Sequence, residues 1–78
     1  MTINEIINLV IDSTDVNPYS GKLSAKDNLI AAIDLAKLYK DFADKGQNDE
    51  AMNIPSSKWV IIIDILNDKL KRLNGTIL

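Results

Sequence analysis

The chain contains no cysteine and no histidine among its 78 residues. Without cysteine, neither disulfides nor thiolate–metal sites can reinforce the fold. Without histidine, the commonest zinc ligand and the commonest general base are both missing. A chain of this length buries only roughly 60% of the surface that its unfolded form exposes, so its core is thin. We therefore expect one domain, residues 1–78, that depends on good helix packing or on a partner chain.

A basic excess and a long apolar run are also missing. Eleven acidic residues stand against nine basic ones, whereas nucleic-acid-binding modules normally carry a clear positive excess. The most apolar stretch, residues 59–66, contains Asp64 and is far shorter than the ~20 residues of a membrane-spanning helix. The first residues lack the basic segment of a signal peptide. These features predict a small acidic cytoplasmic protein, and the many Ile, Asn and Asp residues suit an AT-rich bacterial or phage genome.

Residues 3–11 predict a short helix with one apolar face. Thr2 and Glu5 match a capping box, in which each side chain covers an exposed amide of the other residue. The apolar residues fall at helical spacing: Ile3, Ile6, Ile7 and Val10. So short a helix is unstable alone in water, so we expect it to dock on the central helix.

Residues 12–23 predict a linker rich in turn-forming residues. Its one large side chain, Tyr19, is expected to plug the end of the helical bundle, with a ligand contact as the alternative. The pattern around Tyr19 resembles a calcium-binding EF-hand loop, but Gly21 stands at the seventh loop position rather than the sixth. Lys26 occupies the twelfth position, where a bidentate glutamate is needed. Asx turns account for these residues instead, and we expect no metal site.

The central segment, residues 24–45, predicts a long helix with two apolar seams, capped by Ser24 and stopped by Gly46. One seam is rich in alanine and suits close helix approach: Ala25, Leu29, Ala32, Ala36, Tyr39 and Ala43. The other seam contains Ala31, Leu35, Leu38 and Phe42. Two seams on one helix indicate two neighbours.

Residues 58–74 predict a second long helix, although Trp-Val-Ile-Ile-Ile has the composition of a buried strand. The period decides, because five large apolar residues follow steps of four and three: Trp59, Ile63, Leu66, Leu70 and Leu73. Pro55 suits the first turn, and either Ser56 or Asn53 is the cap. Lys69, Lys71 and Arg72 complement the dipole at the helix C-terminus.

The predicted fold is therefore all-α: a short N-terminal helix plus a long antiparallel helical hairpin. The three predicted helices have more apolar faces than they can cover within one chain. We expect the uncovered apolar residues to form an interface: Ile30, Leu35, Leu38, Phe42, Ile61 and Ile65. An open apolar patch of several hundred Å² usually marks an interaction site. A twofold dimer, in which each copy covers the patch of the other, is the commonest such assembly. The charge is also uneven, net −4 over residues 1–55 and +2 over residues 56–78, which allows a head-to-tail meeting of two chains.

No catalytic motif and no cofactor motif is present, so we expect a non-enzymatic protein that works by contact. Adaptors, inhibitors, immunity-type proteins and assembly proteins acting on another protein or on a second copy belong to this class. A tyrosine and a lysine, Tyr19 and Lys22, precede the first long helix, and a proline leads the second in Ile54-Pro55-Ser56-Ser57. This layout of residues 19–74 resembles small phage-encoded helical hairpins that sequester cyclic nucleotides. That resemblance implies a ligand site at a subunit interface, with Tyr19 stacking on a base and Lys22, Lys26 and Arg72 holding phosphates. Nucleic-acid binding through Lys58, Lys69, Lys71 and Arg72 ranks third.

Overall fold

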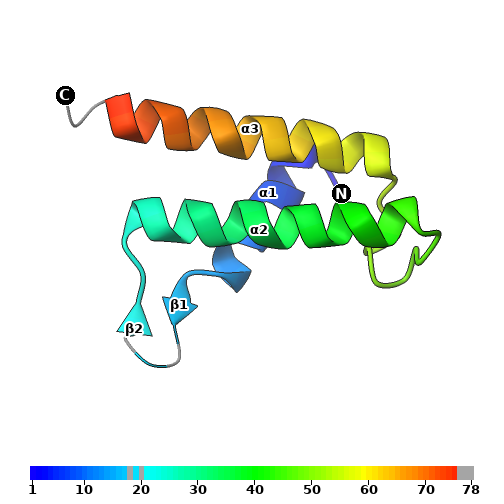
Figure 1. The fold of residues 1–78 in the computed structure, drawn as a ribbon, viewed down its shortest axis with the longest axis horizontal. Coiled ribbons are helices and arrows are strands. Elements are labelled where there is room, and N and C mark those ends of the chain that lie inside the picture. The colour runs from blue at the N-terminus through cyan, green and yellow to red at the C-terminus, as the bar shows by residue number, and fades with distance from the viewer. Residues whose placement is uncertain (18, 20, 76–78) are drawn as a thin grey trace.

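The computed structural model describes residues 1–17, 19 and 21–75 and places three α-helices in them. Helix α1 spans Ile3–Ser13, α2 spans Ala25–Asp44 and α3 spans Ser56–Gly75. In Figure 1, α2 and α3 lie side by side and run in opposite directions, with α1 crossing behind them. Two strands of two residues each, β1 (Val16–Asn17) and β2 (Gly21–Lys22), pair antiparallel before α2. The predicted all-α class is confirmed.

Helix α1 begins at the capping box that the sequence predicts. The Glu5 amide donates to the Thr2 hydroxyl at 3.1 Å, and the Thr2 amide donates to the Glu5 carboxylate at 3.3 Å. The helix extends two residues beyond the predicted end at residue 11. Hydroxyl groups support this last turn, because Ser13 donates to the Leu9 carbonyl at 2.7 Å and Thr14 donates to the Val10 carbonyl at 3.1 Å.

Helix α2 has the predicted ends. The Asp27 amide donates to the Ser24 hydroxyl at 3.2 Å, which satisfies one free amide of the first turn. Gly46 adopts a left-handed conformation with φ of +77°. Its amide donates to the Ala43 carbonyl at 3.1 Å, and the following amide, of Gln47, donates to the Phe42 carbonyl at 2.9 Å. This pair of bonds is a Schellman motif, which terminates the helix.

Helix α3 contains the Trp-Val-Ile-Ile-Ile segment, so the choice of helix over strand is confirmed. The helix starts at Ser56, two residues before the predicted range. Pro55 immediately precedes it, and the Pro55 carbonyl accepts from the amides of Lys58 at 3.0 Å and Trp59 at 3.3 Å. Asn53 has a positive φ of 56° in the loop between the helices.

The core lies where the three helices meet. Its largest fully buried side chains are Trp59, Ile62 and Leu66 from α3 and Ile6, Ile7 and Val10 from α1. Helix α2 contributes Ala32 and Ala36, both fully buried. Small side chains at these two positions let the helix backbones approach closely. Tyr39 stacks on Trp59 with a centroid distance of 5.0 Å.

The segment between α1 and α2 corrects one prediction. Instead of plugging the end of the bundle, Tyr19 is 97% exposed in the turn between β1 and β2. The two strands beside Tyr19 pair with Val16 opposite Lys22. A bond from the Leu23 amide to the Asp15 carbonyl, 2.9 Å long, extends the pairing. None of the helices in the described part of the chain combines the length and the hydropathy of a membrane-spanning segment.

Candidate functional site

The six residues predicted to form an interface differ in how far they are covered. Ile30, Leu38 and Ile61 are exposed, by 40%, 48% and 45% of their surfaces. Leu35, Phe42 and Ile65 are half-buried, and two of them, Leu35 and Ile65, pack against the core. Large aliphatic side chains therefore remain open to solvent on both long helices.

The structure distributes these residues over several faces rather than one patch. On α2, Leu35, Leu38 and Phe42 share a face because they are spaced by three and four residues. Ile30 and Leu38 are eight residues apart, and Asp34, exposed and four residues from each, lies between them. Leu38 and Ile61 each point well away from the buried residues of their own helices. These two side chains therefore face away from the α2–α3 contact, on opposite sides of it.

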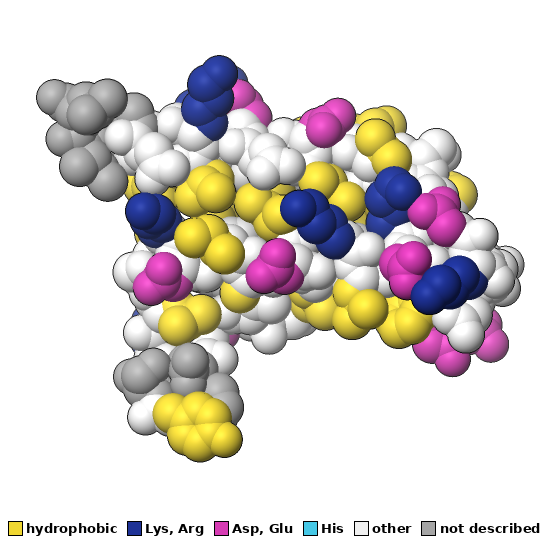
Figure 2. All heavy atoms as spheres, viewed as in Figure 1, with side chains coloured by type: hydrophobic (Ala, Val, Ile, Leu, Met, Phe, Trp, Pro, Cys, Tyr) yellow, Lys and Arg dark blue, Asp and Glu magenta, His cyan; other side chains and the backbone are white. Residues whose placement is uncertain are grey.

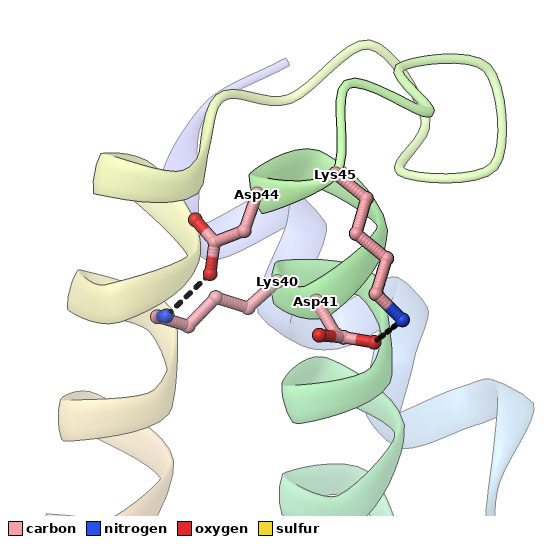
Figure 3. A network of polar contacts seen from close by, with 4 residues as sticks. All are labelled: Lys40, Asp41, Asp44 and Lys45. Atoms are coloured by element: carbon pink, nitrogen blue, oxygen red, sulfur yellow. Dashed lines mark hydrogen bonds and ion pairs between the residues drawn. The ribbon is translucent and has the colours of Figure 1, made fainter.

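Charged side chains follow the outer side of α2. Figure 2 shows acidic and basic groups along this helix, with hydrophobic side chains in the furrow toward α3. Two ion pairs join residues four apart: Lys40 with Asp44, and Lys45 with Asp41, both at 2.8 Å (Figure 3). These pairs fit a solvated helix surface and contribute a few tenths of a kcal/mol each.

Three ionisable groups have displaced pKa values, and each displacement has a local cause. Hydrogen bonds from Lys40 and then Ser56 lower the pKa of Asp44. The hydrogen bonds of the α1 capping box lower the pKa of Glu5, and the bond to Asp41 raises the pKa of Lys45. All three groups lie on the surface and are not the buried, strongly perturbed groups typical of active sites.

A second candidate site is an open depression of about 520 Å³ at one end of the molecule. It lies between the C-terminal ends of α1 and α3 and the first turns of α2. Its lining combines apolar and polar side chains with two cations: Ile11, Ala25, Asn28, Leu29, Leu73, Lys69 and Arg72. Arg72 also pairs with Asp68 at 3.0 Å. An apolar floor beside two cations is suited to a ligand with an anionic group and a flat or apolar part.

The depression contains only part of the ligand set that the sequence predicts. Arg72 lines it, but Tyr19, Lys22 and Lys26 do not. The second cation in the depression is Lys69. The sequence did not single it out as part of the ligand set, because a lysine in the last turns of a helix is explained equally well by the helix dipole. The signal that could have identified it is its spacing of three residues before Arg72, which puts both on one face.

Among the described residues, no group of three or more acidic side chains is placed to hold a metal ion, and no charged side chain is buried. Within the ranges that the structure describes, one buried side-chain nitrogen has no hydrogen-bond partner: the indole Nε1 of Trp59. Trp59 does not line the depression. Its indole nitrogen therefore bears on stability rather than on that site.

Comparison with known proteins adds no assignment, because no family model, no curated protein and no solved structure matches this chain.

Proposed function

We propose that this protein is a non-enzymatic interaction module that acts through apolar helix faces and assembles with copies of itself. Its working unit is the antiparallel pair of α2 and α3, with α1 packed across one side. The observation that carries the proposal is the exposure of Leu38, Ile61 and Ile30 by 40–48%. A thin core loses stability when large aliphatic residues face water, and such surfaces usually mark binding sites.

Protein partners fit these surfaces better than small substrates do. Ile30, Leu38 and Ile61 each lie on a regular helix and are flanked by charged residues, as in an interface with an apolar centre and a polar rim. An adaptor, inhibitor, immunity-type or assembly protein uses surfaces of this kind. The acidic and basic parts of the chain further favour contact between copies.

Analytical ultracentrifugation over a concentration series tests the self-association. We expect the weight-average mass to rise above the monomer mass as the concentration increases. A mass equal to one chain from micromolar to millimolar concentrations would overturn the self-association. The exposed residues would then have to be tested against other proteins.

A second candidate function is the sequestration of a cyclic nucleotide, and the depression beside Lys69 and Arg72 favours it. The exposed Tyr19 and Lys22 would reach a shared ligand from a neighbouring copy. A thermal-shift series with cyclic di- and trinucleotides tests this candidate, and we expect stabilisation that Lys69→Ala removes. Lys71→Ala is the matched control because Lys71 does not line the depression. A flat response of the wild type to every nucleotide would eliminate the sponge.

A further inference from the structure

The outer face of α3 carries apolar and charged residues at positions that are symmetric about the middle of the helix. Four residues spaced by three, four and three define this outer face: Lys58, Ile61, Ile65 and Asp68. Arg72, four residues after Asp68, extends the face toward the C-terminus and pairs with Asp68 at 3.0 Å. At about 100° per residue they lie within roughly 80° of the helix circumference. Lys58, Ile61 and Asp68 are exposed, and Ile65 is half-buried with part of its side chain accessible. The two aliphatic residues are symmetric about the level of Ile63, and so are Lys58 and Asp68.

We propose that this outer face is the contact between two copies of the chain, which pack α3 against α3 antiparallel about a twofold axis at the level of Ile63. In this register Ile61 of each copy meets Ile65 of the other. Lys58 meets Asp68 of the other copy, because each lies five residues, or about 7.5 Å, from the axis. The inference rests on the self-association proposed above and names its face and register.

Charge favours this pairing over the alternatives. A parallel pairing of the same face sets Lys58 against Lys58 and Asp68 against Asp68. Pairing through the Leu38 face of α2 brings together two copies of an edge that carries Asp34, Asp41 and Lys45. Because Lys45 already pairs with Asp41, the charge left on each edge is that of Asp34. Like charges placed opposite each other destabilise a contact. The antiparallel α3 pairing sets opposite charges against each other at both ends.

The rest of the chain agrees with this direction. Residues 46–55, which precede α3, carry Asp49 and Glu50 and no basic residue, whereas the last turns of α3 carry Lys69, Lys71 and Arg72. An antiparallel pair places the acidic loop of one copy near the basic end of the other. Lys58 makes no ion pair within the described part of the chain, so its charge is available. Asp68 pairs with Arg72 on its own helix, but 53% of its side chain stays exposed and can also receive Lys58 of the other copy. The outer face is narrow, so we expect an interface at the small end of the usual range and a dimer that dissociates on dilution.

Sedimentation of matched variants tests the face. Ile61→Asp is expected to abolish dimerisation, and Val60→Asp is its control. Val60 is the preceding residue and is exposed to a similar degree, 41% against 45%, but lies about 100° away on the helix. A wild-type dimer that survives Ile61→Asp but dissociates with Leu38→Asp would overturn this face and leave the proposed function standing. A wild type that stays monomeric would overturn both this face and the self-association.

Charge reversal tests the register. Lys58→Glu alone creates two repulsive pairs in the dimer and is expected to weaken it about tenfold. Adding Asp68→Lys should restore the wild-type dissociation constant to within about twofold. A double variant that dimerises no better than Lys58→Glu would overturn the antiparallel register. Circular dichroism of each variant separates loss of the dimer from loss of the fold.

Cysteine pairing provides a measurement that does not depend on these charges. The chain has no cysteine, so Ile61→Cys and Ile65→Cys each introduce a single thiol. Under mild oxidation, a mixture of the two variants is expected to form the mixed disulfide in preference to either symmetric one. Residues 61 and 65 of different copies are level in the proposed register, whereas 61 and 61 are offset by about 6 Å. A statistical mixture of the three disulfides would contradict the register.

Discussion

Trp59 allows a sharp test of the core, because its indole ring is fully buried while its Nε1 has no hydrogen-bond partner. Replacing it with Phe keeps a ring against Tyr39, the stacking partner at 5.0 Å. The substitution gives up on the order of 50 Å² of buried apolar surface, or about 1–1.5 kcal/mol. It also removes an unpaired buried donor, which costs the wild type about 1–3 kcal/mol. The two effects nearly cancel, so we expect Trp59→Phe to change the free energy of unfolding by less than about 1.5 kcal/mol.

Trp59→Ala is the comparison, because it removes the ring altogether. Large aromatic-to-alanine changes in a core cost about 3–5 kcal/mol, a large part of the roughly 4–12 kcal/mol expected for a domain of this size. Urea unfolding followed by circular dichroism at 222 nm measures both variants without relying on tryptophan fluorescence. A loss above about 3 kcal/mol for Trp59→Phe would refute the reasoning, because it would show that the indole N–H has a partner in solution.

Three further predictions concern helix ends and pH. Gly46→Ala should lower the free energy of unfolding by about 1 kcal/mol, because the φ of +77° penalises a side chain even though nothing lies within 4 Å of the added carbon. Gly46→Asn should lower it less, and a urea titration measures both. Thr2→Ala should lower the free energy of unfolding by about 1 kcal/mol and speed amide hydrogen exchange in α1 but not in α3. Exchange rates in α1 equal to those of the wild type would contradict the role of the cap. Hydrogen bonds in the folded state lower the pKa of Asp44 below its ordinary value of 3.8. The ionised Asp44 therefore stabilises the fold above pH 3.8, and this stabilisation is lost as the pH falls through the lowered pKa. Asp44→Asn should therefore lose less stability than the wild type on acidification below about pH 4, and identical pH profiles would count against this.

Much of the fold could be predicted because its signals are local. The capping box at Thr2, the cap at Ser24 and the glycine stop at Gly46 involve residues within a few positions of one another. The helical period around Trp59 overrode the strand-like composition of the same segment, because only a helix places residues spaced by three and four on one buried face. The extra residues of α1 depended on side-chain bonds from Ser13 and Thr14 that the apolar pattern does not reveal.

The candidate sites were less predictable. The sequence identified apolar residues in excess of the core, but it grouped Ile30, Leu38 and Ile61 as one surface, and the structure places them on different faces. It also predicted that Tyr19 plugs the end of the helical bundle, whereas Tyr19 is exposed between the two short strands. The depression with Lys69 depends on how the ends of three helices meet.

The sequence by itself determined which segments are helical, with ends correct to within two residues, and which stripe of each is apolar, since backbone hydrogen bonds and side-chain period act over a few residues. The tertiary structure decided which stripes are covered. Whether an apolar stripe is covered depends on where α1 crosses the other two helices and on the rotation of each helix about its axis. Both are set by the fit of side chains such as Trp59, Ala32 and Ala36 across the whole core, and no single segment contains that information.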